Sequence, residues 1–169
     1  MLLTIVGIML LGAFMLAANS LMADNVRLAE ENEYILTAIA LAQSVLDEAK
    51  TKAFDAATVS GPVSSPSQLT GAGSLGPNSS EATPNPDTLF STGYRSSTKF
   101  NDVDDYNNYN RLVNTPRAEG YRINVIVQYA STTYPDSIKS FTTFCKRMTL
   151  TVTSPYISTP VKLTYAFLY

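Results

Sequence analysis

The first 54 residues of the chain constrain its fold more than any other stretch, because they read as one long helix. There is no charged side chain and no proline from Met1 to Ala23, and the first proline of the chain is Pro62. An apolar run of about 20 residues is long enough to cross a bilayer as a helix. We therefore expect one helix over residues 1–54, about 75–80 Å long at 1.5 Å per residue.

The two halves of this helix differ in character. Residues 1–23 are apolar on all sides, whereas residues 24–54 carry charges and have a single apolar face. We expect Glu48 and Lys52, four positions apart, to pair on the polar face. The apolar face needs a partner surface, and it follows the helical spacing of Ile35, Ala38, Ile39, Ala42, Val45, Leu46 and Ala49.

The end of the chain, residues 121–169, supplies that partner surface as a predicted antiparallel sheet. Apolar and polar residues alternate over residues 121–129, 148–153 and 161–169, and Ile126 is the one exception to the pattern in the first run. β-branched and aromatic residues dominate all three runs. The sequence therefore predicts an α+β fold in which the helical stripe packs on a β-meander.

Composition narrows the range of functions. The chain has 169 residues and a net charge of −2, so it has no basic surface for nucleic acid. It has no histidine and one cysteine, which excludes histidine-based triads, histidine metal ligands and an intrachain disulfide. No nucleophile, base or phosphate loop stands in a catalytic pattern, so we expect neither an enzyme nor a cofactor.

Between the helix and the sheet, residues 55–120 are predicted to form variable surface loops. Glycine, proline, serine, threonine and asparagine crowd residues 55–90 and break regular structure. The triplet Asn78-Ser79-Ser80 matches the N-glycosylation pattern, and nearby hydroxyls could carry O-linked sugar. The alternative is an unmodified polar loop.

Two smaller features allow alternative interpretations. Asp102, Asp104 and Asp105 could offer oxygens to calcium, although the EF-hand spacing is absent, or could form turns by accepting backbone N–H groups. We favour turns, fixed to the domain by the aromatic residues Phe100, Tyr106 and Tyr109. Cys145 stands beside Lys146 and Arg147, which could lower the pKa of its thiol, but we favour a structural role.

In layout the whole chain resembles the type IV pilins and the pseudopilins of type II secretion. Those proteins have an apolar N-terminal half-helix, an amphipathic second half, a variable loop and a C-terminal antiparallel sheet, and residues 32–48 resemble their second half-helix. Met1 and Ile5 stand where the bacterial family usually has Phe and Glu, and Met22 stands where a proline is usual. We expect a short charged leader to be removed before Met1; the alternative is an ordinary N-terminal membrane anchor.

The resemblance implies a subunit that waits in the cytoplasmic membrane and polymerises into an extracellular filament on the cell surface. Its partners would be copies of itself, a prepilin peptidase and a pilus assembly machinery. The alternatives are a pseudopilin of a secretion system and a membrane-anchored module that binds glycan or protein outside the cytoplasm.

Polymerisation also follows from the helix itself, because a helix that is apolar all round must be surrounded by lipid or protein. The residues expected in the polymer core are Met1, Leu2, Leu3, Thr4, Ile5, Val6, Ile8, Met9, Leu10, Leu11, Phe14, Met15, Leu16 and Leu21. Small residues would let neighbouring helices approach closely, or reflect ordinary membrane-helix composition; these are Gly7, Gly12, Ala13, Ala17 and Ala18.

Overall fold

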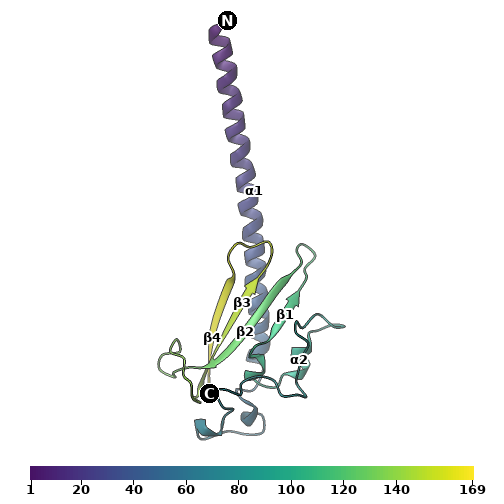
Figure 1. Ribbon diagram of the computed structural model, residues 1–169, viewed down its shortest axis with the longest axis vertical. Helices are drawn as coiled ribbons and strands as arrows, with labels where there is room; N and C mark the ends of the chain where they lie inside the picture. The colour runs from purple at the N-terminus through teal and green to yellow at the C-terminus, as the bar shows by residue number, and fades with distance from the viewer.

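In the computed structural model, which describes residues 1–169, one long helix carries a four-stranded antiparallel sheet on its C-terminal half (Figure 1). This arrangement confirms the predicted α+β class. The helices are α1 (Leu2–Lys50) and α2 (Arg95–Lys99), with 3-10 turns η1 (Ala56–Thr58), η2 (Pro66–Gln68) and η3 (Asp104–Tyr106). The strands are β1 (Asn110–Val113), β2 (Tyr121–Tyr129), β3 (Cys145–Thr153) and β4 (Val161–Leu168).

Helix α1 is continuous over 49 residues, which corresponds to about 74 Å. It ends at Lys50, earlier than the predicted residue 54. The Thr51 N–H and hydroxyl both donate to the Glu48 carbonyl, at 3.1 and 2.7 Å. Ala53 then donates its N–H to the Asn101 carbonyl. The helix therefore ends in local bonds that span three residues, and a tertiary hydrogen bond from Ala53 follows; no glycine or proline marks this point in the sequence.

The apolar stripe of α1 packs on the sheet as predicted. Ala38, Ala42, Val45, Leu46 and Ala49 are buried, while Ile35 and Ile39 at the edge of the stripe are half-buried. Much of the stripe is alanine, which lets the helix approach the sheet closely. The stripe packs mainly against β3 and β4, and the inner side chains of β2 and β3 complete the core: Ile123, Val125, Val127, Met148, Leu150 and Val152.

The sheet has the order β1-β2-β3-β4, and each strand is antiparallel to its neighbour. The three alternating runs of the sequence correspond to β2, β3 and β4. Val125 lies opposite Leu150, so the inner apolar rows of β2 and β3 are in register. Ile126, the exception in the sequence pattern, lies on the outer face and is 48% exposed.

The prediction that residues 55–120 are surface loops is wrong for Asn110–Val113, because these residues form β1. This strand pairs with β2, and Arg111 and Val113 are buried. On its other side, the Asp87 N–H donates to Asn110 and the Asp87 carbonyl accepts from Leu112. A four-residue strand that begins with asparagine and arginine has too little apolar alternation to be recognised from sequence.

Candidate functional site

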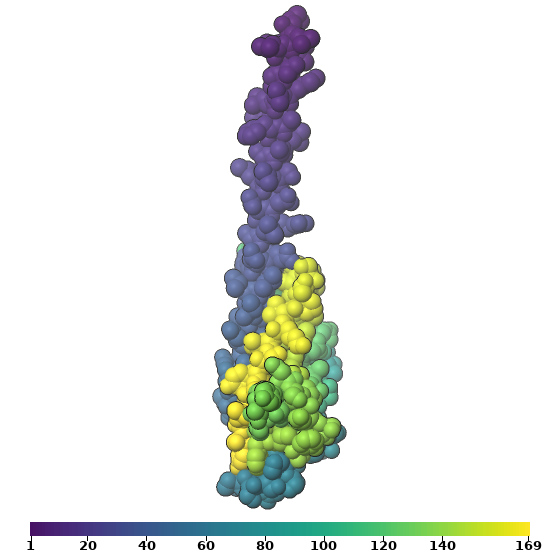
Figure 2. All heavy atoms as spheres, turned by 90° about the vertical axis from the view of Figure 1, so that its left-hand side faces the viewer, coloured from purple at the N-terminus to yellow at the C-terminus, as the bar shows by residue number.

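The N-terminal half of α1 projects from the domain, and none of the rest of the chain covers it. Figure 2 shows this half as a slender rod that extends beyond the sheet. Leu10 is 67% exposed and Phe14 is 72% exposed. The predicted core residues from Met1 to Leu21 are all exposed, and among the five small residues only Ala18 is partly covered. The structure therefore leaves the whole predicted polymerisation surface free.

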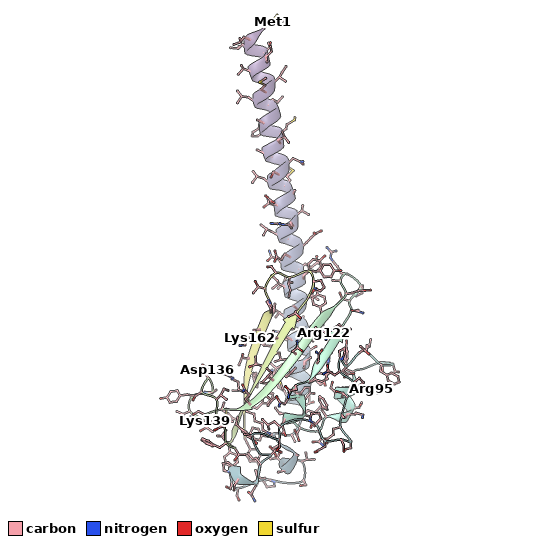
Figure 3. The ribbon with its side chains drawn as sticks, viewed as in Figure 1. Met1, Arg95, Arg122, Asp136, Lys139 and Lys162 are labelled. Atoms are coloured by element: carbon pink, nitrogen blue, oxygen red, sulfur yellow. The ribbon has the colours of Figure 1, made fainter.

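This projecting half is also strongly apolar. An 18-residue window in α1 has a mean hydropathy of 2.2, and none of that window is buried. The helix is long and apolar enough to cross a membrane. Figure 3 shows Met1 at the far tip of the helix, whereas the charged residues labelled there lie on the sheet domain: Arg95, Arg122, Asp136, Lys139 and Lys162.

Nothing within the chain requires small residues in this half. A Cβ added at Gly7 or Gly12 would have no neighbour within 4 Å. By contrast, Gly120 has a φ of +81°, which favours glycine for a reason internal to the fold. Near the tip, the Thr4 hydroxyl donates to the Met1 carbonyl at 2.6 Å. The projecting half therefore offers an exposed apolar surface, and the hydroxyl of Thr4 near its tip is already hydrogen-bonded.

A buried polar cluster fastens the other half of α1 to the sheet domain. The Glu48 carboxylate accepts hydrogen bonds from Arg111 at 2.6 Å, from the Ser96 hydroxyl at 2.7 Å and from the Tyr106 hydroxyl at 2.8 Å. The predicted Glu48–Lys52 pair does not form. Lys52 donates instead to the Ser97 carbonyl at 2.9 Å, because Arg111 and its neighbours occupy Glu48.

The same cluster continues into the domain around Tyr109. The Tyr109 hydroxyl donates to Asp87 at 2.8 Å and accepts from Arg111 at 2.9 Å. The Arg111 guanidinium also lies over the Tyr94 ring, 4.1 Å from its centroid. Burial is the main cause that raises the pKa of the Tyr109 hydroxyl, so this residue acts as a fixed hydrogen-bonding group.

The acidic loop adopts the turn structure that we favoured. One Asp102 oxygen accepts the N–H groups of Asp104 and Asp105, at 2.9 and 3.3 Å. An Asp105 oxygen accepts the N–H groups of Asn101 and Asp102, at 2.9 and 3.3 Å. No group of three or more acidic, histidine or cysteine side chains is placed to hold a metal ion, so the calcium interpretation gains no support.

The aromatic residues of this loop anchor it to the domain, as predicted. Phe100, Tyr106 and Tyr109 are all buried and meet edge to face. The ring centroid of Phe100 lies 4.8 Å from that of Tyr106 and 5.2 Å from that of Tyr109. This cluster fixes the acidic turn beside the end of α1.

The structure also contains a buried cation that was not predicted from the sequence. Lys146 is fully buried, and its ammonium contacts Asp55 and Asp104. The inward direction of Lys146 follows from the alternation of the strand, because Lys146 lies on the same face of β3 as Met148, Leu150 and Val152. Cys145 is buried too, and burial raises the pKa of its thiol, which fits the structural role that we favoured over a thiol activated by neighbouring charges.

No protein-family model, curated protein or solved structure matches this chain.

Proposed function

We propose that this chain is the structural subunit of an extracellular, type IV pilus-like filament. In the filament, residues 1–23 of many copies bundle at the centre, and the sheet domains cover the outside. The observation that carries this proposal is the exposed apolar half of α1, which continues without a break into a half that is fixed to the domain. The domain therefore sets the direction in which the apolar half projects.

The energetic argument rests on the large apolar side chains of this half. Each gains about 1.5–3 kcal/mol when it moves from water into an apolar environment. Leu2, Leu3, Ile8 and Phe14 are each more than 70% exposed in the single subunit. Surrounding copies of the same helix would bury them on every side, which neither the subunit's own sheet nor a partner on one face can do.

The small residues of the half-helix fit the same arrangement. Gly7 and Gly12 have no neighbours that would exclude a side chain within the subunit. Close approach of a second helix gives such glycines a role, because it lets the two backbones pack together. Thr4 already donates to its own backbone, so it adds no unsatisfied hydroxyl to a bundle.

Before assembly the apolar half would be held in the cytoplasmic membrane. Residues 2–23 span about 33 Å as a helix, close to the ~30 Å hydrocarbon core of a bilayer. We propose that a prepilin peptidase processes the subunit and that an assembly machinery transfers it from lipid into the bundle. Because Ile5 carries no charge, no side chain in the apolar half can neutralise a free amine at Met1.

The outer surface of the filament would be formed by the sheet domain and the preceding loops. Asn78, Ser79 and Ser80 are exposed, which suits sugar attachment on the outside of the filament. Release of glycan by chemical deglycosylation, followed by mass spectrometry of the peptide that contains these residues, tests this part of the proposal. An unmodified peptide from native material contradicts it.

Electron microscopy of material sheared from cells that produce the chain tests the main proposal. Gold-labelled antibodies against the sheet domain are expected to decorate filaments along their whole length. The proposal fails if the chain stays in the membrane fraction, is released only by detergent as a single subunit, and leaves the sheared material without labelled filaments. That result would favour a membrane-anchored binding module.

A further inference from the structure

The start of β3 lies near the end of α1, at the end of the domain far from Met1 (Figure 1). Lys146 is the second residue of β3, and its ammonium, with the groups around it, forms a buried polar pocket there. Its side chain is 0% exposed. The ammonium nitrogen Nζ lies 2.7 Å from Asp55 Oδ2, 2.6 Å from Asp104 Oδ1 and 2.8 Å from the Phe54 carbonyl oxygen. An amine and two carboxyl groups are thus held together away from water.

Aromatic rings close this pocket. The Lys146 nitrogen lies 4.8 Å from the centroid of the Phe54 ring and 5.4 Å from that of the Tyr129 ring. Phe54 is itself backed by Tyr169, at 5.5 Å between ring centroids. The rings therefore keep water away from the ammonium and the two carboxyl groups.

The two carboxyl groups differ in how they are held. Asp55 accepts hydrogen bonds from the Ala57 N–H, from the Thr70 N–H and hydroxyl, and from the Tyr129 hydroxyl. Burial opposes its ionisation, but the hydrogen bonds and the charge of Lys146 outweigh burial and hold its pKa below the ordinary value. Asp55 is therefore an ionised carboxylate in direct contact with the Lys146 ammonium, and its lowered pKa means that it holds a proton taken from Lys146 only transiently.

Asp104 has a different neighbour, the buried side chain of Asp102. Asp102 Oδ1 accepts the Asp104 N–H at 2.9 Å, which holds the two residues together. Burial, with the neighbouring Asp104 carboxyl group acting in the same direction, raises the pKa of Asp102 to about 9, so Asp102 carries a proton at neutral pH. This acid can supply a proton to Asp104. Lys146 therefore stands between a base, Asp55, and a carboxyl group that has an acid beside it.

We propose that Lys146 and Asp104 become joined by an intramolecular isopeptide bond, an amide between Lys146 Nζ and Asp104 Cγ. This inference does not depend on whether the chain polymerises. It assigns Asp55 and Asp102 as the groups that move protons during the reaction.

The step balances within the pocket and needs no other reactant. Asp55 takes a proton from the ammonium, and Asp102 gives one to an oxygen of Asp104. The free amine attacks Asp104 Cγ and forms the C–N bond. The nitrogen then gives up a further proton, which restores Asp102, and Asp55 returns its proton to the departing hydroxyl. The C–O bond breaks, one water leaves, and Asp55 and Asp102 end in their starting forms.

Mass spectrometry of the purified full chain tests the proposal. The intact mass is expected to be lower than the sequence mass by one water. Trypsin cannot cleave after an acylated lysine, so the expected product is a branched peptide in which residues 100–111 are joined to residues 140–147. An intact mass equal to the sequence mass overturns the proposal.

Two other outcomes also overturn it. A cyclic imide at an aspartate loses the same water but leaves linear peptides and normal cleavage after Lys146. A branch that joins Lys146 to the peptide containing Asp55 shows that the wrong carboxyl group was assigned as the electrophile.

Variants separate the roles of the residues in the pocket. Lys146→Met is expected to have the full sequence mass. Asp102→Asn keeps both reacting groups but removes the acid, so it is expected to lower the cross-linked fraction at least tenfold in freshly made protein. The matched control Asp105→Asn changes the next acid in the same loop and is expected to leave the fraction unchanged. Equal cross-linking in Asp102→Asn and wild type contradicts the proton-transfer role.

Discussion

Glu48 and Arg111 are 63 positions apart in the chain, yet an Arg111 guanidinium nitrogen lies 2.6 Å from a Glu48 carboxylate oxygen. This pair connects the last turns of α1 to β1, the strand at one edge of the sheet. The side chain of Arg111 is 4% exposed and that of Glu48 is 17% exposed. The helix is thus fixed to the domain by a buried ion pair as well as by its alanine-rich stripe.

Replacement of Glu48 tests the importance of this pair. Glu48→Ala leaves the Arg111 charge buried without its partner and also removes the acceptor for Tyr106 and Ser96. We expect the free energy of unfolding to fall by ~3–5 kcal/mol, measured by urea denaturation of the full chain in detergent. The control is Asp47→Ala, because Asp47 pairs only with the partly exposed Lys50. A loss below 1 kcal/mol for Glu48→Ala would contradict the role assigned to the pair.

Because α1 packs closely on the sheet, we expect enlargement of Ala42 and of Ala40 to have different effects on the free energy of unfolding. Ala42 is fully buried against the sheet, whereas Ala40 is exposed on the other side of the helix. Ala42→Leu inserts a large side chain into a packed core, so we expect it to cost ~1–3 kcal/mol in the same assay. Ala40→Leu is expected to change stability by less than about 0.5 kcal/mol. Equal effects at both positions would mean that the helix does not pack through this face.

The buried acid Asp105 predicts a pH dependence that one variant removes. Burial raises the pKa of Asp105 from 3.8 to about 6, so between these values the folded chain holds a proton that the unfolded chain releases. The contribution of Asp105 to the free energy of unfolding therefore falls as pH rises from about 4 to about 6. Asp105→Asn keeps the acceptor oxygen for the Asn101 and Asp102 N–H groups but does not ionise.

We expect Asp105→Asn to be more stable than wild type by about 1–2 kcal/mol at pH 7 and equally stable at pH 4. Urea denaturation of both proteins at several pH values measures the difference. The comparison isolates the contribution of Asp105 to the pH dependence of stability. Asp55, whose pKa is lowered, makes stability change with pH in the opposite direction, but it is present in both proteins. A variant that is less stable than wild type at pH 7 would contradict the prediction.

Most of the fold was predictable because its largest elements have strong periodic signals. The helical spacing of the stripe from Ile35 to Ala49 predicted both the helix and its buried face. The alternation of residues 121–129 did the same for β2. The exposed exception Ile126 was visible as well. The end of α1 was not predictable, because it depends on hydrogen bonds from Thr51 and Ala53, and Ala53 bonds to Asn101 from a distant loop.

The buried polar groups were the least predictable part. Arg111 and Lys146 are charged residues at inward positions of strands, where their partners come from distant segments of the chain. Glu48 lies beside the apolar stripe of α1 rather than on it, so neither its partial burial nor its partner follows from helical spacing. The projecting apolar half was predictable in full, because its surface depends on local composition alone.

The most direct test of the central claim is a single charge placed in the projecting half. Leu10→Asp would bury an unpaired carboxylate in the proposed bundle, which costs several kcal/mol per subunit. Leu10→Met keeps the apolar character and serves as the control. In electron micrographs of sheared cell-surface material, we expect filaments from wild type and Leu10→Met and none from Leu10→Asp. The Leu10→Asp chain should retain the circular dichroism spectrum of a folded domain. Normal filaments from Leu10→Asp would mean that residue 10 faces water, which would contradict the bundle.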